Sequence, residues 1–168
     1  PLEKLTLAQI DRIVQAHALC LQGPAAGKCA AFVGCEIVGA DFAKLDLSGV
    51  YFQDARFVDC KFSRANLSDA NVSECVFVNT DFNGANLIKS EWFKTAAQGC
   101  CLENVQTSSA DFLQCDFRAA SFIGAQDLAY AHFISCQLAG AKFDPHHVDL
   151  VAYAKLGQVQ EIDVRGTR

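Results

Sequence analysis

The chain has 168 residues, enough for one domain with a sizeable buried core. Its formal net charge of −5 argues against a nucleic-acid-binding surface, which would normally be basic. It has no uninterrupted apolar run of about 18 residues, so no membrane span is expected.

The N-terminal segment predicts a capping helix. Thr6-Leu7-Ala8-Gln9 has the pattern of a capping box, which opens a helix, and Gly23-Pro24 is typical of a helix end. The apolar residues between them recur at helical spacing, which predicts one buried face made of Leu7, Ile10, Ile13, Val14, Ala18 and Leu21. We expect residues 1–29 to form this helix and a linker, with the helix lying over the start of the repeat region.

Residues 30–150 carry a five-residue repeat. Every fifth residue from Phe32 is large and apolar, the residue two before it is mostly small, and 12 of the 13 phenylalanines lie on this track, Phe93 being the exception. A period of five fits neither a helix nor a strand. It fits a chain that turns a corner every five residues, with one large and one small residue pointing inward on each side.

A second period of 20 residues indicates four sides to a coil. It predicts two stacked ladders in the core, one formed by Phe42, Phe62, Phe82, Phe122 and Phe143 and the other by Leu47, Leu67, Leu87 and Leu128. The repeat predicts six coils, at 30–49, 50–69, 70–89, 90–109, 110–130 and 131–150. The track weakens at Ala97 and Thr107, which marks the fourth coil as irregular, and one residue is inserted within Gly124–Asp127.

Several segments resemble the pentapeptide-repeat family, in which Ala, Asp or Asn, Leu or Phe, and a small polar residue follow one another. The match is carried by Ala40-Asp41-Phe42, Ala65-Asn66-Leu67-Ser68, Ala85-Asn86-Leu87 and Ala110-Asp111-Phe112. The resemblance covers about residues 30–150. It implies an all-β solenoid, a right-handed quadrilateral β-helix.

The C-terminal segment, residues 145–168, predicts a short helix and a tail. Asp144-Pro145 is typical of an N-cap followed by proline at the first helical position, and Gly157 of a helix stop. Some topoisomerase-protecting members of the family dimerise through a C-terminal helix and strand. The tail is only loosely similar to theirs, so a homodimer stays an open alternative.

The cysteines and histidines favour structural roles. Six cysteines occupy the small inward position, where they act as small hydrophobic residues: Cys35, Cys60, Cys75, Cys100, Cys115 and Cys136. The adjacent Cys100 and Cys101 leave a regulatory or metal-binding role as the lesser alternative. No metal-ligand spacing supports His146 and His147, no catalytic motif is present, and we expect no cofactor and no enzymatic activity.

Function is therefore expected on the outward surface, where two apolar columns stand out. Phe93, Leu113 and Ile134 follow the inward residue on three successive coils, and Val38, Val58 and Val78 do so on the neighbouring side. An apolar patch in contact with solvent usually marks an interaction site. The alternative for the valines is that branched residues simply suit a strand surface. The sequence also leaves open that Trp92 and Phe93 exchange their inward and outward positions.

The leading hypothesis is a non-catalytic scaffold or protein-interaction module of bacterial type, for which a domain of a larger secretion-system adaptor or effector is one form. The alternative is a DNA-mimicking protein that binds topoisomerase (gyrase), as some family members do, and confers quinolone or toxin protection. Residues 30–149 contain 15 acidic and eight basic residues, a net charge of −7, but the basic residues interrupt the acidic pattern. Without a signal-peptide pattern, and with reduced cysteines, a cytoplasmic location is expected, and secretion by a signal-independent route stays open.

Overall fold

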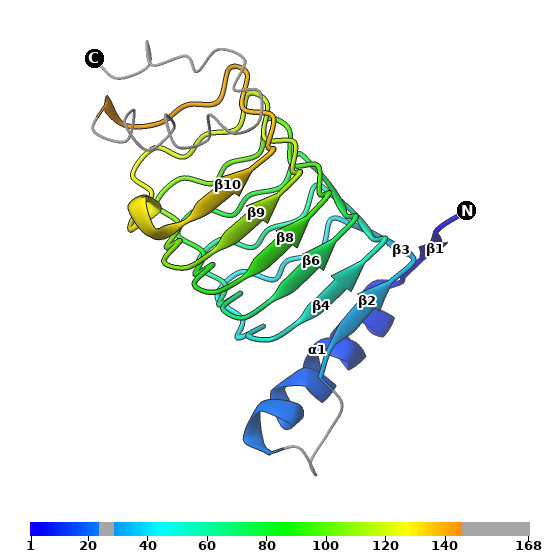
Figure 1. The fold of residues 1–168 in the computed structure, drawn as a ribbon. Coiled ribbons are helices and arrows are strands. Elements are labelled where there is room, and N and C mark those ends of the chain that lie inside the picture. The colour runs from blue at the N-terminus through cyan, green and yellow to red at the C-terminus, as the bar shows by residue number, and fades with distance from the viewer. Residues whose placement is uncertain (24–28, 146–168) are drawn as a thin grey trace.

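The structure, a computed structural model, describes residues 1–23 and 29–145, and these form a four-sided parallel β-helix with a helix at its start (Figure 1). Each coil is built from short segments that turn a corner and stack on the coil before. The elements are β1 (Glu3–Lys4), α1 (Leu7–Gln22), β2 (Ala31–Val33), β3 (Cys35–Val38), β4 (Tyr51–Gln53), β5 (Arg56–Val58), β6 (Asn71–Ser73), β7 (Val76–Val78), β8 (Glu91–Phe93), β9 (Asp111–Leu113), the 3₁₀ turn η1 (Leu128–Tyr130) and β10 (His132–Ile134).

Two of the four sides are regular parallel sheets. One is six-stranded in the order β10-β9-β8-β6-β4-β2, and its strands lie side by side on the broad face of Figure 1. The neighbouring side is four-stranded in the order β1-β3-β5-β7. Backbone bridges between successive coils build the other two sides, for example Asp41 to Lys61 and Asp46 to Asn66. Five coils are complete, and the sixth is described as far as Pro145.

A residue with left-handed backbone makes every corner of the solenoid from Gly34 to Gly124, and again those at Ser135 and Gly140. The corner that closes successive coils has φ of 69° at Gly49, 56° at Asp69 and 58° at Lys89. Glycine adopts this conformation without strain, whereas a side chain makes it less favourable. The five-residue period is therefore fixed by the corner as well as by the inward residue.

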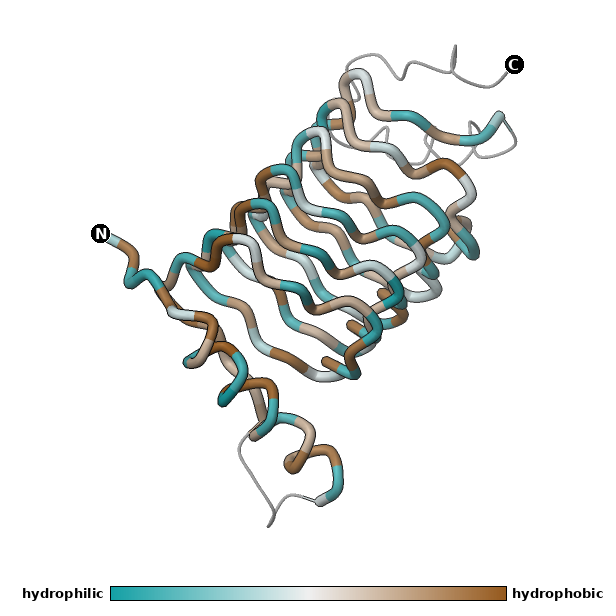
Figure 2. Tube along the Cα trace, turned by 180° about the vertical axis from the view of Figure 1, so that it is seen from behind, coloured by the Kyte–Doolittle hydropathy of each residue, from teal (hydrophilic) through white to brown (hydrophobic). Residues whose placement is uncertain are grey.

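The core contains the two predicted ladders. Phe42 stacks on Phe62 with ring centroids 4.7 Å apart, and Phe62 stacks on Phe82 at 5.2 Å. All nine ladder residues are buried, none with more than 3% of its surface exposed. Hydrophobic and hydrophilic segments alternate along the coils (Figure 2), as expected when one residue points inward and its neighbours point outward.

The fourth coil is regular in its backbone, so the expectation of an irregular coil is wrong. Ala96 bridges Val76 on one side and Asp116 on the other, in register with the coils around it. The change is one of side-chain volume. Trp92 points inward with 1% exposure, and its ring lies 5.5 Å from Phe77 and 6.3 Å from Phe117, the inward residues directly before and after Ala97 in the stack. The indole thus fills the space that Ala97 leaves.

Two other departures from the repeat are absorbed locally. Thr107 is fully buried, and its hydroxyl donates to the carbonyl of Gln126 at 2.9 Å, so its polar group is satisfied within the leucine ladder. The inserted residue lies between Ala125 and Leu128, both of which stay buried. Asp127 takes left-handed backbone there, with φ of 57°, and η1 comes directly after it.

The capping helix α1 begins and ends as predicted, but its buried face is narrower. Thr6 and Gln9 form the reciprocal capping box. Of the predicted face, Ile10 is buried and Ile13 and Val14 are half-buried. Leu7, Ala18 and Leu21 are exposed, Leu7 by 60%. The helix contacts the first coil only through the residues between Ile10 and His17 that face it. The rest of the predicted apolar face remains in contact with solvent. The short strand β1, which the sequence did not predict, pairs with β3 beside it.

His17 is expected to make the cap sensitive to pH. It is fully buried, and its Nδ1 accepts a hydrogen bond from the Ala30 backbone amide at 2.9 Å, which requires a neutral ring. Burial lowers the pKa of His17, and the nearby Asp46 carboxylate opposes this only in part. The unfolded chain therefore binds a proton more readily than the folded one, and stability contributed by neutral His17 is lost as the pH falls below about 6.5.

We expect the melting temperature of the protein to fall between pH 7.5 and 5.5, and to fall less in a His17→Asn variant. Asparagine offers an acceptor oxygen near the position of Nδ1 but does not titrate. Thermal denaturation of both proteins across this range, followed by circular dichroism, measures the difference in slope. Equal slopes would show that His17 does not couple folding of the cap to pH.

The six inward cysteines are buried free thiols, as predicted. Cys20 at the end of α1 and Cys29 before the first coil are joined by a disulfide, with 5.2 Å between their Cα atoms, which the sequence did not predict.

The predicted C-terminal helix, and His146 and His147, lie outside the described residues. The described part of the chain has no helix long and apolar enough to cross a membrane.

Candidate functional site

The column that begins at Phe93 is brought together on the six-stranded sheet. Phe93 pairs with Leu113, and Leu113 pairs with Ile134, on β8, β9 and β10. Phe93 points outward and Trp92 inward, which settles the alternative left open by the sequence. Phe93 and Leu113 are half-buried because they pack on their neighbours in the column, whereas Ile134 is 49% exposed.

A shallow groove of about 420 Å³ runs beside this column. Its second wall is the parallel column on the same strands, two residues earlier in each. The lining residues are Asn71, Ser73, Glu91, Trp92, Phe93, Asp111, Leu113, His132 and Ile134. The groove therefore has an apolar wall and a polar wall, and it crosses from β6 to β10.

The polar wall is acidic in its middle. Asp111 Oδ1 lies 2.6 Å from His132 Nδ1, so these two exposed side chains partner each other. Glu91 is exposed and has no ion pair within residues 1–23 and 29–145. At the opposite edge, the Lys94 ammonium lies 5.0 Å from the centroid of the Phe93 ring, a cation–π contact. The apolar wall thus lies between the acidic wall inside the groove and Lys94 on the outer rim.

The sequence pattern did not predict this acidic wall, because its residues and those of the apolar column occupy different positions of the five-residue repeat. Glu91, Asp111 and His132 precede their inward residues by one position, and Phe93, Leu113 and Ile134 come one position after them. The alternation of a strand puts both positions on the same outward face. That rule would have paired the two columns.

The valine column is also assembled as predicted, on the four-stranded sheet. Val38 pairs with Val58, and Val58 pairs with Val78. Val38 is 38% exposed, and the other two are half-buried. None of the three lines the groove. This column therefore shows the burial expected of branched residues on a strand surface.

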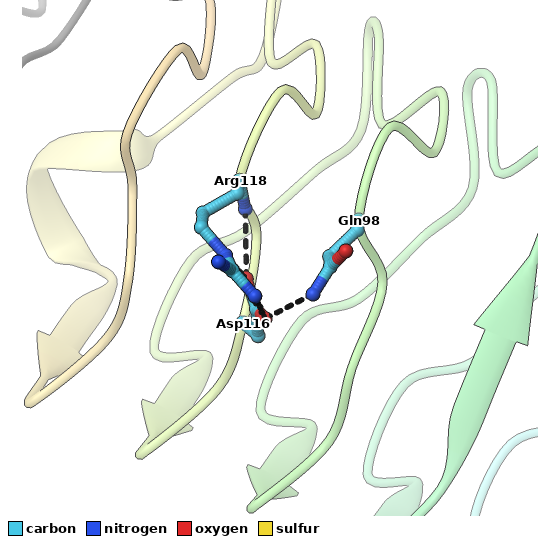
Figure 3. Close-up of polar contacts among 3 residues, drawn as sticks. All are labelled: Gln98, Asp116 and Arg118. Carbon is cyan, nitrogen blue, oxygen red and sulfur yellow. Dashed lines mark hydrogen bonds and ion pairs between the residues drawn. The ribbon is translucent and has the colours of Figure 1, made fainter.

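A polar cluster continues the side of the valine column further along the solenoid (Figure 3). Arg118 binds Asp116 through two parallel hydrogen bonds, Nε to Oδ1 at 2.9 Å and a terminal nitrogen to Oδ2 at 2.6 Å, and Gln98 donates to Asp116 from the coil before. Partial burial works to raise the pKa of Asp116, but these bonds outweigh it and hold the pKa below its usual value. The cluster is satisfied internally.

The adjacent cysteines point in different directions. Cys100 faces inward and is buried, whereas Cys101 faces outward and is half-buried. Burial raises the pKa of both thiols, which disfavours the reactive thiolate. Within residues 1–23 and 29–145, no group of three or more His, Cys, Asp or Glu side chains is placed to hold a metal ion.

Comparison with solved structures places the fold among known solenoids. HetL, a pentapeptide repeat protein involved in heterocyst differentiation regulation from the cyanobacterium Nostoc sp. strain PCC 7120, is 18% identical with a TM-score of 0.54, over 83% of this chain and 72% of HetL. Rfr23, a pentapeptide repeat protein from the cyanobacterium Cyanothece 51142, is 18% identical with a TM-score of 0.45, over 68% of this chain and 84% of Rfr23. QnrB1, a plasmid-mediated fluoroquinolone resistance protein, is 21% identical with a TM-score of 0.41, over 78% of this chain and 92% of QnrB1.

Sequence comparison addresses the repeat itself. Among curated proteins, no sequence matches this chain. Residues 28–64 and 60–91 match the family described as pentapeptide repeats, with eight copies. The remaining coils continue the same track in register, from Trp92 to Phe143. Residues 28–91 therefore carry the repeats of the pentapeptide-repeat family, and the later described coils continue them.

Proposed function

We propose that this protein is a non-catalytic interaction module, and that it binds a partner protein through the groove on its six-stranded sheet. The observation that carries the proposal is the apolar wall of Phe93, Leu113 and Ile134 beside the acidic residues Glu91 and Asp111. An interface core is typically apolar, with charged residues at its rim. The groove offers both within one surface, on a regular parallel sheet.

The groove is favoured over the valine column for a geometric reason. Side chains on both walls of a groove can enclose a partner side chain, and interface hot spots lie in such pockets. Val38, Val58 and Val78 form a single column and line no part of the groove. The valine column is kept as the second candidate surface in the binding experiment.

A DNA-mimicking role is the weaker candidate. A mimic needs long continuous rows of acidic side chains, and basic side chains interrupt the acidic ones here. Lys61 bridges Asp41 on one side and Asp81 on the other, and Arg118 binds Asp116. The net charge of −7 over residues 30–149 is therefore dispersed rather than arranged in rows.

The cytoplasmic location expected from the sequence is a proposal with one observation against it. Seven free thiols in the described residues suit a reducing compartment. The Cys20–Cys29 disulfide instead favours an oxidising one. In the cytoplasm we expect these two cysteines to be reduced like the other seven.

We expect Phe93→Asp and Leu113→Asp each to weaken partner binding about tenfold or more, since a buried carboxylate at an interface core removes a hot-spot contact. The measurement is a pull-down from a lysate of the source organism, quantified by mass spectrometry and repeated with the purified partner. The matched control is Ile123→Asp. Ile123 is also half-buried and follows an inward residue of the fifth coil, but it lies on the opposite side of the solenoid.

A captured protein supports the groove only if it no longer binds either groove variant but still binds the Ile123→Asp control. Loss of binding in Val58→Asp with full binding in Phe93→Asp would move the surface to the four-stranded sheet. Capture that survives all of these changes would contradict an interaction through either column. Circular dichroism and thermal denaturation of every variant check that the solenoid is intact.

A further inference from the structure

The spacing of the groove residues along the solenoid specifies what kind of segment fits them. Phe93, Leu113 and Ile134 pair across neighbouring parallel strands, so they are one strand spacing apart. That spacing is about 4.8 Å, and two intervals span about 9.6 Å. A partner lying along the groove must present side chains at a similar repeat to contact all three.

An α-helix matches this repeat better than an extended strand. One helical turn advances about 5.4 Å, so two turns span about 10.8 Å, a mismatch of only about 1 Å. In an extended strand, side chains on one face repeat about every 6.8 Å, and two repeats span about 13.6 Å, a mismatch of about 4 Å. A helix can therefore place one side chain over each of the three coils.

The width of the groove also suits a helix. On each strand, the acidic and apolar positions are two residues apart, for example Glu91 and Phe93, so the two walls stand about 6.8 Å apart. One row of apolar side chains from a helix can enter between the walls. The flanks of that helix then lie over the rims.

The charges at the two rims of the groove determine which charged residues the flanks of the docked helix can carry. Glu91 is exposed and without an ion pair in the described part of the chain, and no Lys or Arg lines the groove. A cation on one flank of the helix would contact Glu91. On the other rim Lys94 covers Phe93, so a second cation there would be repelled. The charge asymmetry orients the helix.

We propose that the occupant of the groove is an amphipathic α-helix of a partner protein, lying along the solenoid axis. Its apolar stripe, at positions i, i+3 or i+4, and i+7, packs on Phe93, Leu113 and Ile134, and a Lys or Arg on its flank contacts Glu91. This inference rests on the proposed function, because it requires the groove to be a docking surface. It goes further by stating the secondary structure, the direction and the charge of the partner segment.

The test is a selection of binding peptides. A displayed library of random 18-residue peptides is selected on the intact protein, and peptides that also bind Phe93→Asp are removed. We expect the survivors to carry apolar residues at helical spacing with Lys or Arg on one flank, and to become helical on binding. Glu91→Lys should weaken their binding about three- to tenfold. Glu103→Lys is the control, since Glu103 lies on the opposite side of the same coil.

Each other outcome overturns a defined part of the proposal. Survivors with apolar residues at every second position, or with acidic flanks, would overturn the helix and leave the docking surface in place. Binders that all tolerate Phe93→Asp, or a selection that enriches nothing, would overturn both. A dimer in sedimentation velocity that Phe93→Asp dissociates would show that a second copy of this chain occupies the groove instead.

Discussion

Replacing Trp92 with alanine is expected to lower the free energy of unfolding by about 3–5 kcal/mol, the usual range for removal of a large buried aromatic side chain. The indole is 1% exposed and lies within 6.3 Å, centroid to centroid, of four phenylalanine rings, those of Phe77, Phe82, Phe112 and Phe117. The neighbouring inward residue is Ala97, which is too small to collapse into the cavity. Denaturant unfolding followed by far-ultraviolet circular dichroism measures the loss.

A pair of exchanges tests the volume compensation directly. The third coil has Val72 and Phe77 at the positions that Trp92 and Ala97 occupy in the fourth. Ala97→Phe alone should overpack the core, at a cost of about 1–3 kcal/mol. Combined with Trp92→Val, it restores the pattern of the third coil, so the double variant should lose clearly less stability than the two single variants together. Additive losses would contradict the compensation.

This compensation shows how far a one-dimensional repeat can predict packing. The track of inward residues is correct as predicted from the sequence, because a period of five and a period of 20 constrain the same positions independently. A small inward residue such as Ala97 is a break in that track when each position is considered alone. In three dimensions the indole of Trp92, on another side of the solenoid, fills the space beside Ala97. The total side-chain volume of a coil is therefore conserved, whereas the volume at each position is not.

The ends of the solenoid were the least predictable part of the fold. The repeat constrains every inner coil through its two neighbours, whereas an end coil has only one. Helical spacing gives the direction of the apolar arc of α1 but not the width of the surface that the first coil presents. The pairing of β1 with β3 satisfies backbone groups at the edge of the four-stranded sheet, and nothing in a two-residue strand signals it.

The candidate site was predictable in its stacking but not in its depth. The register of the coils places Phe93, Leu113 and Ile134 in one column, and the structure confirms this. Whether such a column is a flat surface or one wall of a groove depends on the neighbouring column. Here Glu91 and Asp111 complete the groove, and in the proposed complex their charge selects a basic flank on the partner segment, which the apolar residues alone could not specify.

Ile10→Asp is expected to detach the capping helix, whereas Leu7→Asp is expected to have almost no effect. The helical pattern assigns both residues to one apolar face, but Ile10 is 4% exposed and Leu7 is 60% exposed. A carboxylate at Ile10 would be buried against the first coil without a partner, at a cost of about 3 kcal/mol or more. At Leu7, the first residue of α1, a negative charge interacts favourably with the helix dipole.

Hydrogen exchange locates the effect. The Leu5 amide donates to Glu36 and the Ala30 amide to His17, at 3.0 and 2.9 Å, so both should lose protection in Ile10→Asp while the inner coils keep theirs. A detached cap also uncovers the unpaired edge of the first coil, and concentration-dependent association in size-exclusion chromatography should result. Equal loss of protection in Leu7→Asp would mean that the helix packs through the wider face. Protected amides in both variants would mean that β1 and the Cys20–Cys29 disulfide hold the cap without Ile10.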